Sequence, residues 1–326
     1  MGIVKSKSIR KYSQLWKGNT FVFTFNAFGT NCRLHICSKN KNLAQSSAMQ
    51  VLQWIEDFEN RYSIYIPGNW ISEVNQHAGE KEVELKSRDI EILNAAQLAF
   101  YLSEGHLDAS FFPLSKLWRL AISKGEVPSD KQVKEMQALV NWNKVEITND
   151  SIFLPTKGMG LDFGGFGKEY AIDRTGKILM EANINQFLID YGGDILAHGF
   201  TENETPWTIG IEKWDGSGEK ASVVYLHNRA IASSGSYRRF FELGGKRFSH
   251  ILDGQTGFPT LNDNLSASVL NSSCLKAGIL ATCVVLEGSK NGLRRIDRTW
   301  DTDCFIQGLD LHLQTDNFNN VLLNEN

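Results

Sequence analysis

The sequence lacks the features that mark disulfide-rich, membrane-spanning or nucleic-acid-binding proteins. Its 326 residues hold five cysteines and no Cys-x-x-Cys pair, so neither a disulfide framework nor a common zinc motif is indicated. No apolar run approaches the roughly 18–20 residues of a membrane-spanning helix. The 34 lysines and arginines face 37 acidic residues, which leaves no basic field to hold nucleic acid. A hydrophobic fraction of 42% predicts instead a globular protein with a substantial core.

The cysteines are expected to be ordinary buried thiols. Cys32 and Cys37 lie five residues apart on one expected strand, so their side chains should point to opposite faces. Reduced thiols, and a basic N-terminus without an apolar signal segment, favour a cytoplasmic location for the chain as it stands. A protein whose export signal had been removed would look the same, and its location would be periplasmic.

The hydrophobic pattern predicts helices and strands in an irregular order. Alternation indicates strands at residues 21–25, 32–36, 187–189, 207–211 and 223–226, and a hairpin at 145–154. Apolar residues three and four apart predict helices at 43–62, at 89–103 with Tyr101 on the apolar face, and after Ser129. The regular alternation of a doubly wound sheet is missing, so the fold class is α+β. With six prolines and no linker, we expect one domain at 20–315 between an extension at 1–19 and a tail at 316–326.

Four glycine-bearing segments carry the residues that are suited to phosphate chemistry. They are residues 161–170, 190–194, 233–239 and 249–259. Glycines bare the backbone for close approach to a ligand, and hydroxyls and cations suit phosphate oxygens. In the last segment His250 precedes Asp253 by three residues and is a candidate base or ligand. Each segment alone is equally compatible with a plain turn.

Taken together and in order, the segments resemble the ApbE family of FAD:protein FMN transferases. Residues 233–237 (Ser-Ser-Gly-Ser-Tyr) are similar to its Thr-Ser-Gly-x-Tyr segment, and 250–259 to its His-x-x-Asp-Pro-x-Thr-Gly-x-Pro signature. Residues 162–173 match its Asp-x-Gly-Gly-x-x-Lys-Gly-Tyr-x-x-Asp loop, and 28–30 (Phe-Gly-Thr) resemble its Met-Gly-Thr. The similarity covers about residues 20–310.

The resemblance implies an ApbE-like fold, with mixed or antiparallel sheets flanked by helices and FAD between the N- and C-terminal parts. Members of the family cleave FAD and attach the FMN half by a phosphoester to a Thr or Ser of a target flavoprotein. They release AMP and use magnesium as the metal. Residues implied in catalysis are His250 and Asp253. Residues implied in FAD binding are Phe28, Tyr65, His106, Leu107, Asp108, Asp162, Lys168, Ser234 and Leu252.

The implied metal site departs from the family pattern. The resemblance places the Gly165 carbonyl at the metal, with an Asp and a Thr from an Ala-Asp-x-x-x-Thr segment. Here Thr282 is present but Gly278 replaces the Asp. Because magnesium prefers anionic oxygens, we expect weaker metal binding and reduced turnover, unless Asp253 or Asp194 compensates, and we expect Gly278→Asp to restore activity. The alternatives are a non-catalytic FAD-binding protein and an FAD pyrophosphatase that forms FMN and AMP.

Overall fold

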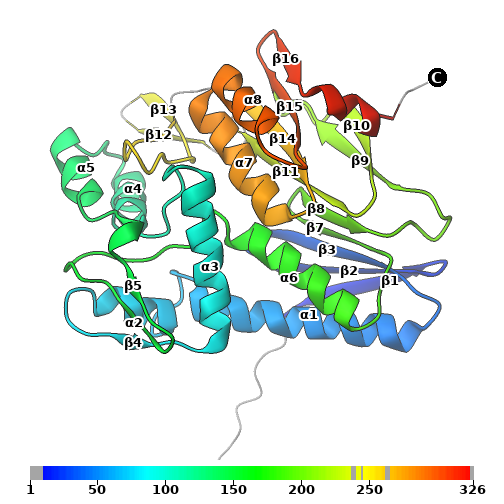
Figure 1. The fold of residues 1–326 in the computed structure, drawn as a ribbon, viewed down its shortest axis with the longest axis horizontal. Helices are drawn as coiled ribbons and strands as arrows, with labels where there is room; N and C mark the ends of the chain where they lie inside the picture. The colour runs from blue at the N-terminus through cyan, green and yellow to red at the C-terminus, as the bar shows by residue number, and fades with distance from the viewer. Residues whose placement is uncertain (1–9, 236–239, 244, 261–264, 324–326) are drawn as a thin grey trace, which may run out of the picture.

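A nine-stranded antiparallel sheet forms the core of the larger of two lobes (Figure 1). The computed structural model describes residues 10–235, 240–243, 245–260 and 265–323. The strands, in spatial order, are β1 (Tyr12–Lys17), β2 (Thr20–Ala27), β3 (Thr30–Cys37), β7 (Phe187–Tyr191), β8 (Asp194–His198), β11 (Arg229–Gly235), β14 (Leu265–Asn271), β15 (Asp303–Gly308) and β16 (Leu311–Gln314). Every neighbouring pair is antiparallel, which confirms the α+β class.

Helices α1 (Lys41–Tyr62), α6 (Gly167–Glu181) and α7 (Cys274–Glu287) cover one face of this sheet (Figure 1). The alternating aromatic residues of β2, such as Phe21 and Phe25, point into the core beneath the helices. Helix α1 begins where the side chain of Asn40 accepts a hydrogen bond from the backbone of Leu43. All the apolar positions that predicted α1 are buried, as expected.

The opposite face is covered by the hairpin of β9 (Trp207–Glu212) and β10 (Lys220–Leu226) and by η2 (Asp316–Val321). Cys32 packs in the core on the helical side and Cys37 in the core on the hairpin side, as their spacing predicts. All five cysteines are buried and free of disulfides. The strand β1 and η2 lie outside the expected domain at 20–315, yet one extends the sheet and the other buries Phe318 against it.

A second lobe lies beside the sheet and is mainly helical (Figure 1). It comprises α2 (Trp70–Gln76), α3 (Ser87–Leu102), α4 (Phe112–Lys124), α5 (Asp130–Gln137), η1 (Trp142–Lys144), the small strands β4 (Val83–Glu84), β5 (Glu146–Ile147) and β6 (Ser151–Phe153), and the hairpin of β12 (Phe240–Leu243) and β13 (Lys246–Ser249). The remaining helix, α8 (Ser289–Asp297), packs beside α7. Within the described residues, no helix combines the length and apolar character needed to cross a membrane.

One expected position on a helix face is wrong. The periodicity predicts Tyr101 on the apolar side of α3, but its side chain is exposed. The buried side carries Ile92 and Leu93 together with Ala95, Ala96 and Ala99. Small side chains let α3 approach α6 and α7 closely, so alanine rather than tyrosine marks the inner face.

Candidate functional site

A cavity of about 420 Å³ lies between segments from both halves of the chain. Its volume is within the range of small-molecule sites. Eleven predicted site residues line it, namely Phe28, His106, Leu107, Asp108, Asp162, Gly165, Lys168, Ser234, Leu252, Gly278 and Thr282, together with the predicted base His250. The four glycine-bearing segments that lie far apart in the sequence therefore meet around one cavity.

Two predicted residues in the described part of the chain do not line this cavity. Tyr65 is 76% exposed, and its ring lies 5.2 Å from the guanidinium of Arg119. Asp253 turns its carboxylate toward His106. Ser236, Tyr237 and the two arginines that follow them in the family-like segment lie outside the described residues.

The glycine-rich loop before α6 is shaped by Asp162. Its Oδ1 accepts a hydrogen bond from the backbone N–H of Gly164 at 2.9 Å, and its own N–H donates to the carbonyl of Ala109 at 2.8 Å. Gly164 and Gly165 are exposed on the cavity wall. The turn thus presents backbone to a ligand directly before the N-terminus of a helix, where phosphate is favoured.

A charged cluster formed by Lys168, Glu169 and Asp194 occupies the cavity wall next to this loop. The Lys168 ammonium contacts the Asp194 carboxylate and lies 3.4 Å from Oε1 of Glu169. Asp194 also accepts a hydrogen bond at 3.0 Å from the backbone of Ser233, which ties β8 to β11. Burial raises the pKa of Glu169 to about 7 against the opposing charge of Lys168. Burial lowers the pKa of Lys168, but the two carboxylates outweigh it and raise this pKa overall.

Helix α7 brings Gly278 and Thr282 to the cavity, and Asp173 of α6 holds its first turn. The Asp173 carboxylate accepts hydrogen bonds from Oγ of Ser273 at 2.6 Å and from the backbone of Cys274 at 2.8 Å. These contacts satisfy otherwise unpaired groups at the start of the helix. Gly278 and Thr282 lie four residues apart, and both line the cavity. The motif aspartate at position 173 therefore fixes where α7 places these two residues.

The space beside Gly278 is filled by Glu169. A Cβ built on Gly278 would lie 2.5 Å from Cγ of Glu169 and 3.1 Å from its Cδ, well inside van der Waals contact. A side chain at position 278 therefore requires the Glu169 side chain to move, so the expected effect of Gly278→Asp depends on Glu169. Sequence reasoning missed Glu169, although the signal was present: the family loop Asp-x-Gly-Gly-x-x-Lys-Gly has glycine at its eighth position, where this chain has Glu169.

Asp108 lines the cavity with both carboxylate oxygens already engaged. Oδ1 accepts from the backbone N–H and the hydroxyl of Ser110 at 2.7 and 2.6 Å, and Oδ2 accepts from the backbone of Trp142 at 3.0 Å. These bonds fix the wall formed by the segment that follows α3. These contacts indicate that Asp108 stabilises the shape of the cavity wall.

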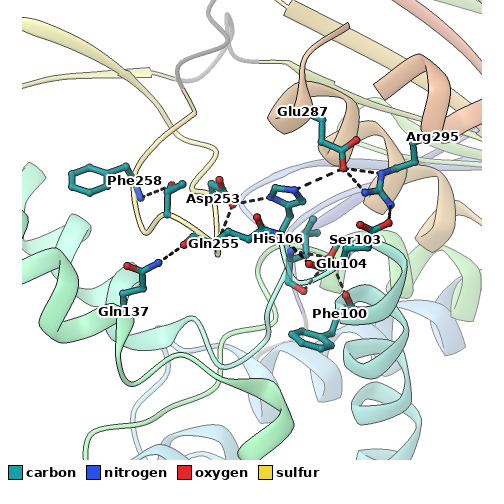
Figure 2. A network of polar contacts seen from close by, with 12 residues as sticks. Phe100, Ser103, Glu104, His106, Gln137, Asp253, Gln255, Phe258, Glu287 and Arg295 are labelled. Atoms are coloured by element: carbon teal, nitrogen blue, oxygen red, sulfur yellow. Dashed lines mark hydrogen bonds and ion pairs between the residues drawn. The ribbon is translucent and has the colours of Figure 1, made fainter. Parts of the chain in front are cut away.

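A polar network links His106 to the end of α7 (Figure 2). Its Nδ1 lies 2.9 Å from Oδ1 of Asp253, and its Nε2 lies 3.8 Å from Oε1 of Glu287. Glu287 also accepts from Arg295, which donates to the carbonyl of Leu102 at 3.0 Å. The network joins the 253 loop, α7, α8 and the end of α3, and it orients the His106 ring at the cavity.

The charge of His106 predicts a pH dependence of stability. The hydrogen bond from His106 to Asp253 raises the pKa of the imidazole against burial, and Glu287 adds to this effect. Because the folded pKa lies above the unfolded value of about 6.5, the stabilisation is complete below that pH and is lost as pH rises through the folded pKa. We expect His106→Gln to cost about 1 kcal/mol more at pH ~6 than at pH ~9, measured by urea unfolding without FAD. Equal losses at both pH values would contradict this role.

Comparison with known proteins gives one consistent family. The profile of the ApbE family matches residues 28–306. The chain is 30% identical over 248 residues to the FAD:protein FMN transferase of Haemophilus influenzae, covering 73% of this chain and 72% of that protein. It is 28% identical over 258 residues to the FAD:protein FMN transferase of Vibrio cholerae, covering 77% of each.

Solved structures share the fold. The flavin transferase ApbE from Vibrio cholerae superposes with a TM-score of 0.79 at 22% identity, covering 96% of this chain and 100% of that one. The ApbE protein from Thermotoga maritima superposes with a TM-score of 0.81 at 23% identity, covering 95% and 99%. These values confirm the architecture expected from the sequence resemblance.

Proposed function

Because this chain belongs to the ApbE family, we propose that it is an FAD:protein FMN transferase. The observation that carries the proposal is the single cavity in which the four glycine-bearing segments meet. In the proposed reaction, a Thr or Ser hydroxyl of a target flavoprotein attacks the phosphorus on the FMN side of the FAD pyrophosphate. The P–O bond to the AMP half breaks, FMN becomes a phosphoester of the acceptor, and AMP leaves.

The residues of the cavity suit these steps. His250 is exposed at the cavity and directly follows the β12–β13 hairpin, so an acceptor side chain can reach it from solvent. We propose that His250 is the general base that accepts the proton of the attacking hydroxyl. The backbone of Gly164 and Gly165 and the ammonium of Lys168 line the region proposed for the pyrophosphate. Phe28 and Leu252 provide apolar surface for the rings of FAD.

The charge of the cavity supports magnesium as the partner of FAD. Among the described lining residues, four carry a carboxylate (Asp108, Asp162, Glu169 and Asp194), whereas Lys168 carries an ammonium. A pyrophosphate would add further negative charge, so a divalent cation is needed to offset the repulsion. When bound, magnesium neutralises charge that develops on the phosphoryl oxygens.

The donor set also fits magnesium. The described residues contain no cluster of three or more His, Cys, Asp or Glu that could hold a metal by themselves. Magnesium commonly uses one or two carboxylates together with substrate phosphates and water, so it does not require such a cluster. We propose the carbonyl of Gly165, the hydroxyl of Thr282 and one carboxylate of the cavity wall as its protein ligands.

The test is incubation with FAD and magnesium, with and without an acceptor flavoprotein domain, followed by AMP release and covalent flavin fluorescence. AMP release and labelling that both require the acceptor support the transferase. AMP release at the same rate without acceptor would indicate the pyrophosphatase instead. Retention of FAD without AMP under all conditions would indicate a binding protein.

A further inference from the structure

The carboxylate of Glu169 reaches the cavity from α6 at the place where a side chain on α7 would begin. The Cβ that Gly278 lacks would lie 3.3 Å from Oε1 of Glu169, as well as closer still to its Cγ. The Glu169 side chain is 14% exposed, and it lines the cavity together with Gly165 and Thr282. A half-buried carboxylate, a carbonyl and a hydroxyl thus line the same cavity.

The sequence departs from the family pattern at both of these positions, and the two departures are complementary. Position 169 has a carboxylate where the pattern has glycine, and position 278 has glycine where the pattern has a carboxylate. Both residues lie on helices that pack against each other, and Asp173 fixes α7 on α6 through Ser273. One exchange therefore keeps both the negative charge and the occupied volume of this wall.

We infer that Glu169 is the carboxylate ligand of magnesium in this chain and takes the place of an aspartate at position 278. The inference rests on the proposed function and identifies the carboxylate ligand that the magnesium site would otherwise lack. Glu169 lies next to Lys168, whose ammonium is 3.4 Å from Oε1, so one cation already compensates part of the negative charge of the wall. The pair of Glu169 and Asp194 still carries more negative charge than Lys168 compensates, which favours a divalent cation there. Gly278 is then required for space and is not a defect of the site.

Metal binding can be measured apart from turnover by titrating the protein–FAD complex with Mn²⁺ and recording free Mn²⁺ by electron paramagnetic resonance. We expect Glu169→Gln, which keeps the shape of the side chain, to weaken Mn²⁺ binding by at least about tenfold. The control is Glu91→Gln, because Glu91 contacts Tyr170 and Arg174 of the same helix from outside the cavity. It should bind Mn²⁺ like the wild type. Equal affinity in Glu169→Gln and the wild type would overturn the inference.

A reciprocal exchange gives a second test. Glu169→Gly alone should lose Mn²⁺ affinity, and Gly278→Asp alone should lower the melting temperature because the two side chains collide. The double variant Glu169→Gly/Gly278→Asp should recover Mn²⁺ affinity to within about threefold of the wild type, since it restores one carboxylate at the wall. Tighter Mn²⁺ binding by Gly278→Asp alone would overturn the inference, because it would show that a carboxylate was missing.

The two proposals fail in different ways. If the wild type releases no AMP in the presence of an acceptor, the proposed function fails, while the Mn²⁺ titrations still decide the role of Glu169. If the wild type transfers FMN but Glu169→Gln binds Mn²⁺ normally, only the ligand assignment fails.

Discussion

Replacing His250 by alanine is expected to lower the rate of FMN transfer by about 10²–10⁴-fold, the usual contribution of a general base. His250 lines the same cavity as the residues proposed to hold the pyrophosphate and is exposed, so its removal should change the melting temperature little. The affinity for FAD should stay within a few-fold, because the proposed role of the imidazole is at the acceptor hydroxyl. The measurement is single-turnover labelling of the acceptor at saturating FAD.

Two controls separate proton transfer from structural damage in His250→Ala. Added imidazole should restore part of the transfer rate, with a pH dependence that follows its own protonation. Ser115→Ala, at another position on the cavity lining, should keep the rate within a few-fold. Full activity of His250→Ala would remove this residue from the reaction. A large loss of folding stability would show instead that its role is structural.

Replacing Asp89 by alanine is expected to lower the free energy of unfolding by about 3–5 kcal/mol, because it leaves the half-buried guanidinium of Arg61 and the buried hydroxyl of Tyr62 without their partner. The Asp89 carboxylate is fully buried and accepts from Nε of Arg61 at 2.6 Å and from the hydroxyl of Tyr62 at 2.6 Å. It also accepts from the backbone of Lys86 at 2.7 Å. Asp89 thus joins the last turn of α1 to the first turn of α3.

The pH dependence of the Asp89 effect has a defined sign. Burial alone would raise the pKa of Asp89, but the hydrogen bonds from Arg61 and Tyr62 outweigh it and lower this pKa overall. The stabilisation is therefore present above the unfolded pKa of about 3.9 and is lost as pH falls through the folded pKa.

Urea unfolding at neutral pH measures the loss. The control Glu135→Ala removes an acid that is exposed on α5 beside Lys131, and it should cost no more than about 0.5 kcal/mol. A similarly small loss of unfolding free energy for Asp89→Ala would contradict the proposed role of Asp89 in joining α1 to α3.

Much of the fold was readable from local patterns. The spacing of apolar residues in α1 predicted both the helix and its buried face, because a long helix on a sheet needs one continuous apolar stripe. The same reasoning failed for the face of α3. There the helix packs closely against other helices through alanines, and Tyr101 is left exposed. Periodicity predicts which side is buried only where large apolar residues define it.

The candidate site was predicted residue by residue from the family resemblance, and most of those residues line the cavity. The exceptions are Tyr65 and Asp253, which do not line the cavity. The order of motifs along the sequence does not show which motif residues point into the cavity. Asp253 contacts His106 because the 253 loop folds back over the end of α3. That contact depends on the path of a loop, and no local pattern encodes it.

The sequence by itself determined the class of fold, the family and the residue types at the site, because these depend on periodicity and on the order of short motifs. It also contained both departures at positions 169 and 278, but as two unrelated mismatches. Only the tertiary structure decided that they are one feature, since the packing of α6 on α7 brings Glu169 into the space that Gly278 leaves open. Because interiors are close-packed, two side chains compete for the same volume only where the fold brings them together, so an exchange between distant positions becomes visible only when the helices are packed together.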